Sequence, residues 1–181
     1  MNKQELRTLF LAKRLLLTED EVILKSNSLS EKALLIIREV KPSLVLLFLP
    51  ISNKNEFDCK ELVVKLWSLG IKTAIPVTDF TTKAMHFAIF DSNTELVEKK
   101  YGISEPRNPI YIKEYKNALA IVPLLAHDKS NFRVGYGGGF YDRFFQQQTN
   151  MYKLGVTFFA PVDFIDDLDT FDIRLDKVVF D

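Results

Sequence analysis

The sequence of 181 residues contains only one cysteine and two histidines. Because Cys59 has no possible partner, an intramolecular disulfide is excluded, and a reducing compartment fits this composition. Two histidines and one cysteine also make no zinc site. The chain has no excess of either charge, since Lys and Arg together number 24, as do Asp and Glu. We therefore expect neither nucleic acid nor a membrane as a partner, because no global positive field exists to bind them.

Long apolar runs are missing as well. The longest run, residues 44–51, has the length of a strand and falls far short of the ~20 residues of a membrane span. The first 17 residues mix five charged side chains with apolar ones and do not have the pattern of a signal peptide. From these two absences we expect a cytoplasmic protein. We also expect a single domain over residues 1–181, because this length suits one hydrophobic core.

Hydrophobic periodicity predicts helices and strands that alternate along the chain. The capping box of Thr18 and Glu21 marks the start of a helix that reaches about Val40, in pieces. The other expected elements are helices at 2–17, 56–69 and 140–148, and strands at 44–49, 73–77, 85–90, 118–122, 152–158 and 178–180. This order predicts an α/β fold, a three-layer sandwich around a mainly parallel sheet.

Four of the seven glycines lie within five residues, in Gly135-Tyr136-Gly137-Gly138-Gly139, between a buried strand and a helix. Backbone amides and a helix dipole can bind a phosphate there, and glycine lets the anion come close. The cluster is neither a Walker loop nor a dinucleotide fingerprint, because it lacks Gly-Lys-Ser/Thr and Phe140 occupies the last glycine position. Arg133 and Asp142 flank it with a cation for phosphate and a carboxylate for Mg²⁺. From the residues alone, a surface turn with a structural ion pair remains an alternative.

Several segments together resemble the 5-formyltetrahydrofolate cyclo-ligase family. Residues 133–143 resemble its signature, R-[LIV]-G-x-G-x-G-[YF]-Y-D, and residues 3–7 resemble its N-terminal K-x-x-x-R, with Arg14 in its usual further place. Further matches are Phe48-Leu-Pro-Ile-Ser52 with Glu56-Phe-Asp58, Gly102-Ile-Ser-Glu-Pro106, Ile121-Val-Pro123 and residues 172–179. The chain departs from the family at His127, Asn131, Phe140 and Phe171, where phenylalanine, glycine, tyrosine and histidine are common.

The resemblance implies a NagB/RpiA/CoA-transferase-like fold and an enzyme that closes 5-formyltetrahydrofolate to 5,10-methenyltetrahydrofolate. ATP would phosphorylate the formyl oxygen to give an imidate phosphate, with release of ADP and phosphate and with Mg²⁺ as cofactor. The expected partners are therefore ATP and 5-formyltetrahydrofolate, with or without a polyglutamate tail, and the expected state is a monomer.

The same resemblance implies the site residues. It places ATP on Lys3, Gln4, Glu5, Leu6, Arg7, Arg133, Val134, Gly135, Tyr136, Gly137, Gly138, Gly139, Phe140 and Tyr141. It places folate on Ile51, Glu56, Tyr136, Gly137, Gly138, Gly139 and Phe140. It assigns Mg²⁺ to Asp142 and Asp176, and catalysis to Arg133 and Tyr141.

Spacing gives these residues a physical reading. Lys3, Arg7 and Arg14 share one helix face, which without the resemblance would be read as a solvated face. The resemblance favours phosphate contacts for the first two and leaves Arg14 open. A carboxylate at Glu56 suits the N–H donors of a reduced pterin, although at a helix start it would also stabilise the dipole.

Two other functions compete with this one. Another sugar- or nucleotide-phosphate enzyme on a related scaffold would lack the folate residues around Glu56. A non-catalytic folate- or nucleotide-binding regulator would not need Lys3, Arg7, Arg133 and Asp142, which this chain keeps.

Overall fold

The computed structural model describes residues 1–51 and 53–181, so Ser52 of the segment with family resemblance lies outside the described residues. The helices are α1 (Lys3–Leu15), α2 (Glu19–Val40), α3 (Lys60–Ser68), the short η1 (Lys100–Gly102) and α4 (Phe140–Gln147). The strands are β1 (Leu44–Leu46), β2 (Lys72–Asp79), β3 (Ala84–Phe90), β4 (Leu96–Glu98), β5 (Ser104–Pro106), β6 (Ala118–Pro123), β7 (Ala126–His127), β8 (Arg133–Val134), β9 (Tyr152–Thr157) and β10 (Lys177–Phe180).

Six strands form one sheet in the order β10-β9-β6-β1-β2-β3. Every neighbouring pair is parallel except β2 and β3, which form an antiparallel hairpin at the edge. From β1 the chain moves outward to β2 and β3, and it then returns to the other side of β1 with β6. The order therefore reverses between β1 and β6, where open α/β sheets bind ligands beyond the carboxyl ends of their strands. The prediction of an α/β fold around a mainly parallel sheet is confirmed.

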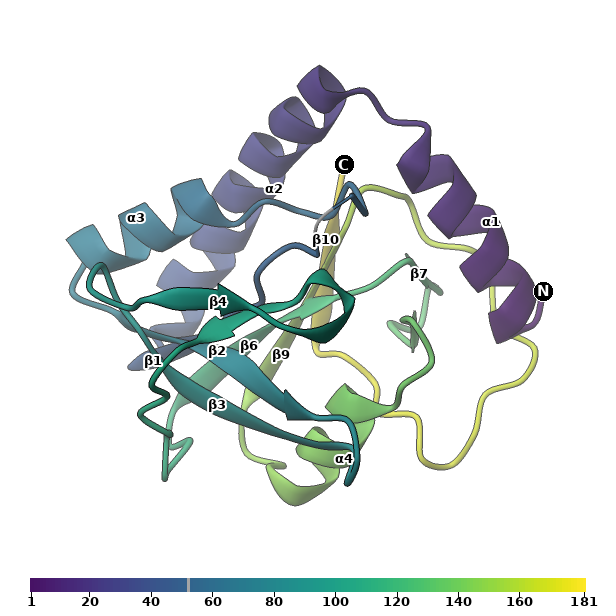
Figure 1. Cartoon of the computed structure of the whole chain (residues 1–181). Helices are drawn as coiled ribbons and strands as arrows, with labels where there is room; N and C mark the ends of the chain where they lie inside the picture. Colours follow the sequence, from purple (N-terminus) through teal and green to yellow (C-terminus); the bar gives the residue numbers. More distant parts are fainter. Residues whose placement is uncertain (52) are drawn as a thin grey trace.

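Helices cover both faces of this sheet, which makes three layers (Figure 1). On one face, Val45 and Leu47 pack with buried residues of α2 and α3. On the other face, Leu44 and Leu46 pack with Phe144 of α4. Side chains on a strand alternate between faces, so this division follows from the continuous apolar run that begins at Leu44.

The N-terminal helix rests on a separate, smaller cluster. Leu6 and Phe10 of α1 are buried against Leu125, Ala126 and Val134, which lie in and beside the β7–β8 hairpin. Figure 1 shows α1 beside β7 and apart from α2 and α3. The opposite face of α1 is therefore available to a site.

The helix ends agree with the sequence where capping chemistry sets them. Thr18 and Glu21 form the predicted capping box, and Asn2 and Glu5 form a second one. In contrast to the expected broken helix, α2 is continuous and ends where Lys41 takes a left-handed conformation with φ 52°. Within the described residues, no helix is both long and apolar enough to cross a membrane.

Two predicted bounds were wrong near the site. The strand expected at 44–49 ends at Leu46, and the helix expected from Glu56 begins only at Lys60. The physical reason is that the described residues between β1 and α3 form hydrogen bonds that do not follow the repeating pattern of a strand or a helix. The Glu56 carboxylate, for example, accepts a hydrogen bond from the amide of Ile51 at 2.8 Å. Glu56 is thus not a helix-terminal charge, and its function must be read from its contacts.

Candidate active site

A cleft of about 920 Å³ lies at the reversal point of the sheet. Its floor comes from the segments that follow β1 and β6, and one side comes from the β2–β3 hairpin. The opposite side is formed by α1 and by the loop that joins β8 to α4. A volume of this order is at the upper end for one small ligand and leaves room for two reacting molecules.

The cleft collects many of the predicted site residues. Those lining it are Lys3, Arg7, Arg14, Ile51, Glu56, Arg133, Val134, Gly135, Tyr136, Gly137, Gly138, Gly139, Phe140, Tyr141 and Asp142. The cleft is also lined by residues for which the sequence predicted no role: Phe80, Lys54, Lys83 and Tyr101. Two of them lie next to segments that resemble the family: Tyr101 precedes the segment beginning at Gly102, and Lys54 lies just before Glu56.

Three positive charges of α1 face the cleft, as the helical spacing predicts. Lys3, Arg7 and Arg14 all line it, and the Nε of Arg7 donates to the carbonyl of Gly135 at 2.9 Å. The intervening predicted ATP residues lie elsewhere. Leu6 is fully buried in the cluster beneath the helix, and Glu5 caps the helix through its contacts with Asn2. Gln4 is exposed, and its side chain accepts from Arg7 at 2.6 Å. Among residues 3–7, the geometry thus favours Lys3 and Arg7 as direct ligands.

The glycine loop, which connects β8 to α4, contains two residues with a positive φ. Gly137 has φ +89°, and Gly139, the N-cap of α4, has φ +67°. A Cβ at Gly137 would come within 3.2 Å of the Arg7 guanidinium, whereas a Cβ at Gly135 would meet no atom of the described residues within 4 Å. The loop therefore contacts the Arg7 guanidinium at Gly137 and leaves open space at Gly135. It ends at the N-terminus of α4. This arrangement suits an anion such as phosphate.

Aromatic side chains form the wall next to this loop. The rings of Phe80 and Phe140 pack edge to face with their centroids 5.5 Å apart, and the centroids of Phe80 and Tyr101 are 5.1 Å apart. All three rings line the cleft. Such flat apolar surfaces match the ring systems of nucleotides and folates. Burial, and to a lesser degree the charge of Glu56, raises the pKa of the nearby Tyr141 phenol, so this group keeps its proton at neutral pH.

Carboxylates lie at the edge of the cleft nearest to Lys3 and Arg133. Asp142 contacts Arg133 at 2.7 Å and accepts from the amide of Ile173 at 3.1 Å, both through Oδ1. Asp172 lines the cleft and contacts the Nζ of Lys3 at 2.5 Å. Asp176 does not line it, and its carboxylate binds Lys153 through the amide at 2.7 Å and Nζ at 3.1 Å.

This geometry bears on the predicted magnesium ligands. Among the described residues, no three His, Cys, Asp or Glu side chains come together for a metal. Mg²⁺ usually takes one or two carboxylates together with phosphate oxygens, which two aspartates beside a phosphate site would supply. Asp142 fits this role, while Asp172 is better placed than the predicted Asp176. A metal role for either remains a prediction.

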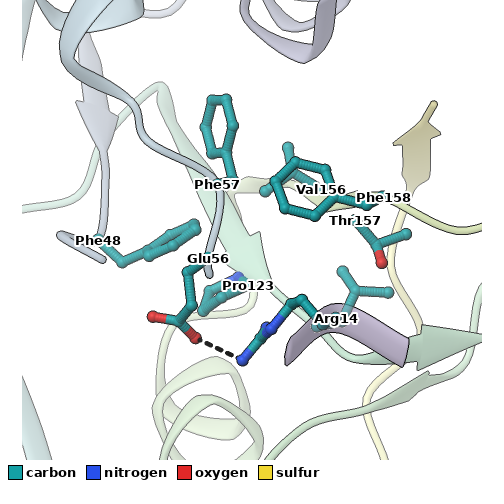
Figure 2. A pocket seen from close by; sticks show the side chains of 9 residues that line it. Arg14, Phe48, Glu56, Phe57, Pro123, Val156, Thr157 and Phe158 are labelled. Carbon is teal, nitrogen blue, oxygen red and sulfur yellow. Dashed lines mark ion pairs between the residues drawn. The ribbon is translucent and has the colours of Figure 1, made fainter. Parts of the chain in front are cut away.

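Glu56 belongs to a buried polar group at the floor of the cleft. Its Oε1 accepts from the Tyr136 hydroxyl at 2.9 Å and lies 3.5 Å from Nη2 of Arg14. Figure 2 shows the two charged side chains pointing toward each other beside Phe48 and Pro123. Arg14, which sequence analysis left open, therefore lies at the folate side of the predicted site.

Comparisons with known proteins identify the family. The profile of the 5-formyltetrahydrofolate cyclo-ligase family matches residues 1–181. The chain is 30% identical over 151 residues to the 5-formyltetrahydrofolate cyclo-ligase of Haemophilus influenzae, and the match covers 82% of this chain and 80% of that protein.

Two solved structures of 5,10-methenyltetrahydrofolate synthetases have a similar fold. The Mycoplasma pneumoniae structure is 22% identical with a TM-score of 0.78, and the match covers 98% of both chains. The Aquifex aeolicus structure is 28% identical with a TM-score of 0.77, and the match covers 99% of this chain and 90% of that one. The sequence profile, the curated relative and the shared fold point the same way, and the chain belongs to the 5-formyltetrahydrofolate cyclo-ligase family.

Proposed function

We propose that this enzyme uses ATP and Mg²⁺ to close 5-formyltetrahydrofolate to 5,10-methenyltetrahydrofolate, with release of ADP and phosphate. The observation that carries the proposal is that one cleft holds both a cationic glycine loop and the Glu56 group. The first suits a triphosphate and the second suits the N–H donors of a reduced pterin. Because both sites share one cleft, the γ-phosphoryl group and the formyl oxygen can meet.

The chemistry requires activation of a poor electrophile. In the proposed route, the formyl oxygen attacks the γ-phosphorus of ATP, and the bond from that phosphorus to the ADP oxygen breaks. N10 of the same folate then attacks the formyl carbon and loses its proton, and the carbon–oxygen bond breaks to release phosphate. Transfer of this kind depends mainly on positioning and charge neutralisation.

The residues of this chain have separable roles in that route. Lys3, Arg7 and Arg133 would neutralise phosphate charge, and the glycine amides would orient the triphosphate. Asp142, with Asp172, would hold Mg²⁺, which supplies further positive charge to the phosphate oxygens when it is bound. The protonated Tyr141 can donate a hydrogen bond to an oxygen on which charge develops.

The test is the reaction itself. The purified protein is mixed with ATP, Mg²⁺ and 5-formyltetrahydrofolate, and the methenyl chromophore is followed while ADP and phosphate are measured. We expect one ADP and one phosphate per methenyltetrahydrofolate, and no product with a non-hydrolysable ATP analogue. Full-rate cyclisation without ATP, or ATP hydrolysis independent of folate, would contradict the proposal.

A pair of lysines on α1 provides a matched control. Lys3 lines the cleft, whereas Lys13 lies ten residues along the same helix, where its Nζ stands 4.9 Å from the Phe10 ring centre, outside the cleft lining. Lys3→Ala should raise the KM for ATP roughly tenfold or more, since it removes a phosphate cation. Lys13→Ala should leave the KM for ATP unchanged. Equal effects of the two substitutions would show that the helix contributes only its general charge.

A further inference from the structure

Three segments that lie far apart in the sequence meet at Glu56. Arg14 comes from the last turn of α1, Tyr136 from the glycine loop, and Glu56 from the segment between β1 and α3. Nη2 of Arg14 donates to the Tyr136 hydroxyl, and that hydroxyl donates to Oε1 of Glu56 at 2.9 Å. Oε2 of Glu56 accepts from the amide of Ile51 at 2.8 Å. Both carboxylate oxygens are thus held by donors that belong to different segments.

The charged side chains of Arg14 and Glu56 are buried, which makes each dependent on its partners. Arg14 and Glu56 are each only 5% exposed, so neither charge is well solvated. A buried charge is stable only when it is paired and hydrogen-bonded, and removal of one partner leaves the other uncompensated. Arg14 and Glu56 line both the large cleft and a small cavity of about 10 Å³, and Figure 2 shows the pair at the small cavity. The pair therefore forms part of the floor on which a ligand would rest.

Tyr136 connects the two charged groups. The family signature leaves position 136 open, and this chain has a tyrosine there. Burial, together with the charge of Glu56, raises the pKa of this phenol above its ordinary value. The hydroxyl therefore remains protonated and can donate to the carboxylate while it accepts from Arg14.

We propose, on the basis of the function above, that Arg14 and Tyr136 are positioning residues that hold the Glu56 carboxylate in the orientation that the folate requires. They act on folate through Glu56 and make no essential contact with ATP. This explains why a cation of α1 lies on the folate side, seven residues beyond Arg7, whose own contact is with Gly135. It also gives the glycine loop a second role besides the predicted phosphate contacts.

The first measurement is ligand affinity for Tyr136→Phe, which keeps the ring and removes only the hydroxyl. Dissociation constants for 5-formyltetrahydrofolate and for ATP are measured separately by calorimetry. We expect folate binding to weaken about tenfold and ATP binding to change less than about twofold, because one hydrogen bond to a charged group is lost. The matched control is Tyr111→Phe. Tyr111 is 48% exposed, similar to Tyr136 at 43%, and lies outside the cleft lining, so neither affinity should change.

The decisive measurement is a double-substitution cycle with Glu56→Gln. If Tyr136 acts through Glu56, then Tyr136→Phe should cause little further loss of folate affinity when Glu56→Gln is already present. Independent, additive losses would overturn the inference, since they would mean that Tyr136 contacts the folate by itself. Equal weakening of ATP binding would also overturn it.

Arg14 is tested by comparing two replacements. Arg14→Lys keeps the positive charge and should recover more folate affinity than Arg14→Met, which removes it. Thermal unfolding and ATP affinity are measured for both, so that a folding defect is recognised by loss of both ligands. If the two variants bind folate equally, the charge has no positioning role. A parent protein that does not bind 5-formyltetrahydrofolate would refute the proposed function itself and this inference with it, whereas normal parent binding with additive variants would refute the inference alone.

Discussion

Alanine at Gly137 should disrupt the phosphate loop in a way that alanine at Gly135 does not. Gly137 has φ +89° and lies against Arg7, and a Cβ there would come within 3.2 Å of Nη2. Gly135 has no positive φ, and a Cβ there would have open space around it in the part of the chain that the structure describes. Gly137→Ala therefore tests whether the loop needs the backbone conformation of glycine. Gly135→Ala tests whether a bound anion needs the space that a methyl group would fill.

The expected sizes follow from these geometries. An L-residue in left-handed backbone costs about 1 to 2 kcal/mol, so Gly137→Ala should lower the Tm by about 2 to 8 °C for a chain of this size. Displacement of Arg7 should also weaken ATP binding by about tenfold or more, since a charge-assisted hydrogen bond is disturbed. Gly135→Ala should leave the free energy of unfolding within about 0.5 kcal/mol of the parent value.

The assay combines thermal unfolding with and without ATP and calorimetric ATP binding. If backbone amides hold the triphosphate, Gly135→Ala should reduce ATP affinity although its unliganded stability is unchanged, because only the ligand meets the new methyl group. Normal ATP affinity in Gly135→Ala, with only a stability loss in Gly137→Ala, would show that the cluster is a turn. Valine at Gly138 is a poorer test, since its Cβ would lie 2.8 Å from the Phe140 ring even without ligand.

Three further predictions concern the carboxylates and a buried histidine. Asp142→Asn and Asp172→Asn should each raise the Mg²⁺ concentration needed for half-maximal turnover, whereas Asp176→Asn should not, and a magnesium titration with the opposite ranking would refute the geometric choice. Glu56→Gln should weaken folate binding by about tenfold and leave ATP binding nearly unchanged, and equal losses in calorimetry would indicate a folding defect. Burial lowers the pKa of His127 to about 4, so the unfolded chain gains a proton before the folded one as the pH falls from about 6.5 to about 4. Up to about 3 kcal/mol of stability should be lost over that interval, and His127→Phe should abolish this part of the loss in urea unfolding curves.

Much of the fold could be predicted because its signals are local. The capping box of Thr18 and Glu21 set the start of α2, and the apolar run from Leu44 identified a strand covered on both faces. The start of α3 could not be obtained in this way. Glu56 has the character of a helix N-terminal residue, but tertiary contacts with Arg14 and Tyr136 use its carboxylate instead.

The site shows the same limit. Helical spacing placed Lys3, Arg7 and Arg14 on one face, and that face does line the cleft. Spacing could not show that Arg14 reaches Glu56, because this contact depends on where the folded chain places Glu56, between β1 and α3. Likewise Asp172 and Asp176 belong to one acidic stretch, and only the path of the chain from residue 172 to β10 decides which of them faces Lys3.

The separate cluster beneath α1 has a consequence for the dynamics of the enzyme. The helix rests on the β7–β8 hairpin, and among the described residues its buried side chains belong to neither of the two larger clusters on the faces of the sheet. Local opening of α1 should therefore cost less free energy than opening of the sheet, and its amide hydrogens should exchange earlier than those of β1 or β6. A triphosphate bound between Lys3, Arg7 and the glycine loop would join this helix to the rest of the molecule. Slower hydrogen exchange in α1 on addition of ATP would then show that the bound substrate holds this wall of the cleft in place.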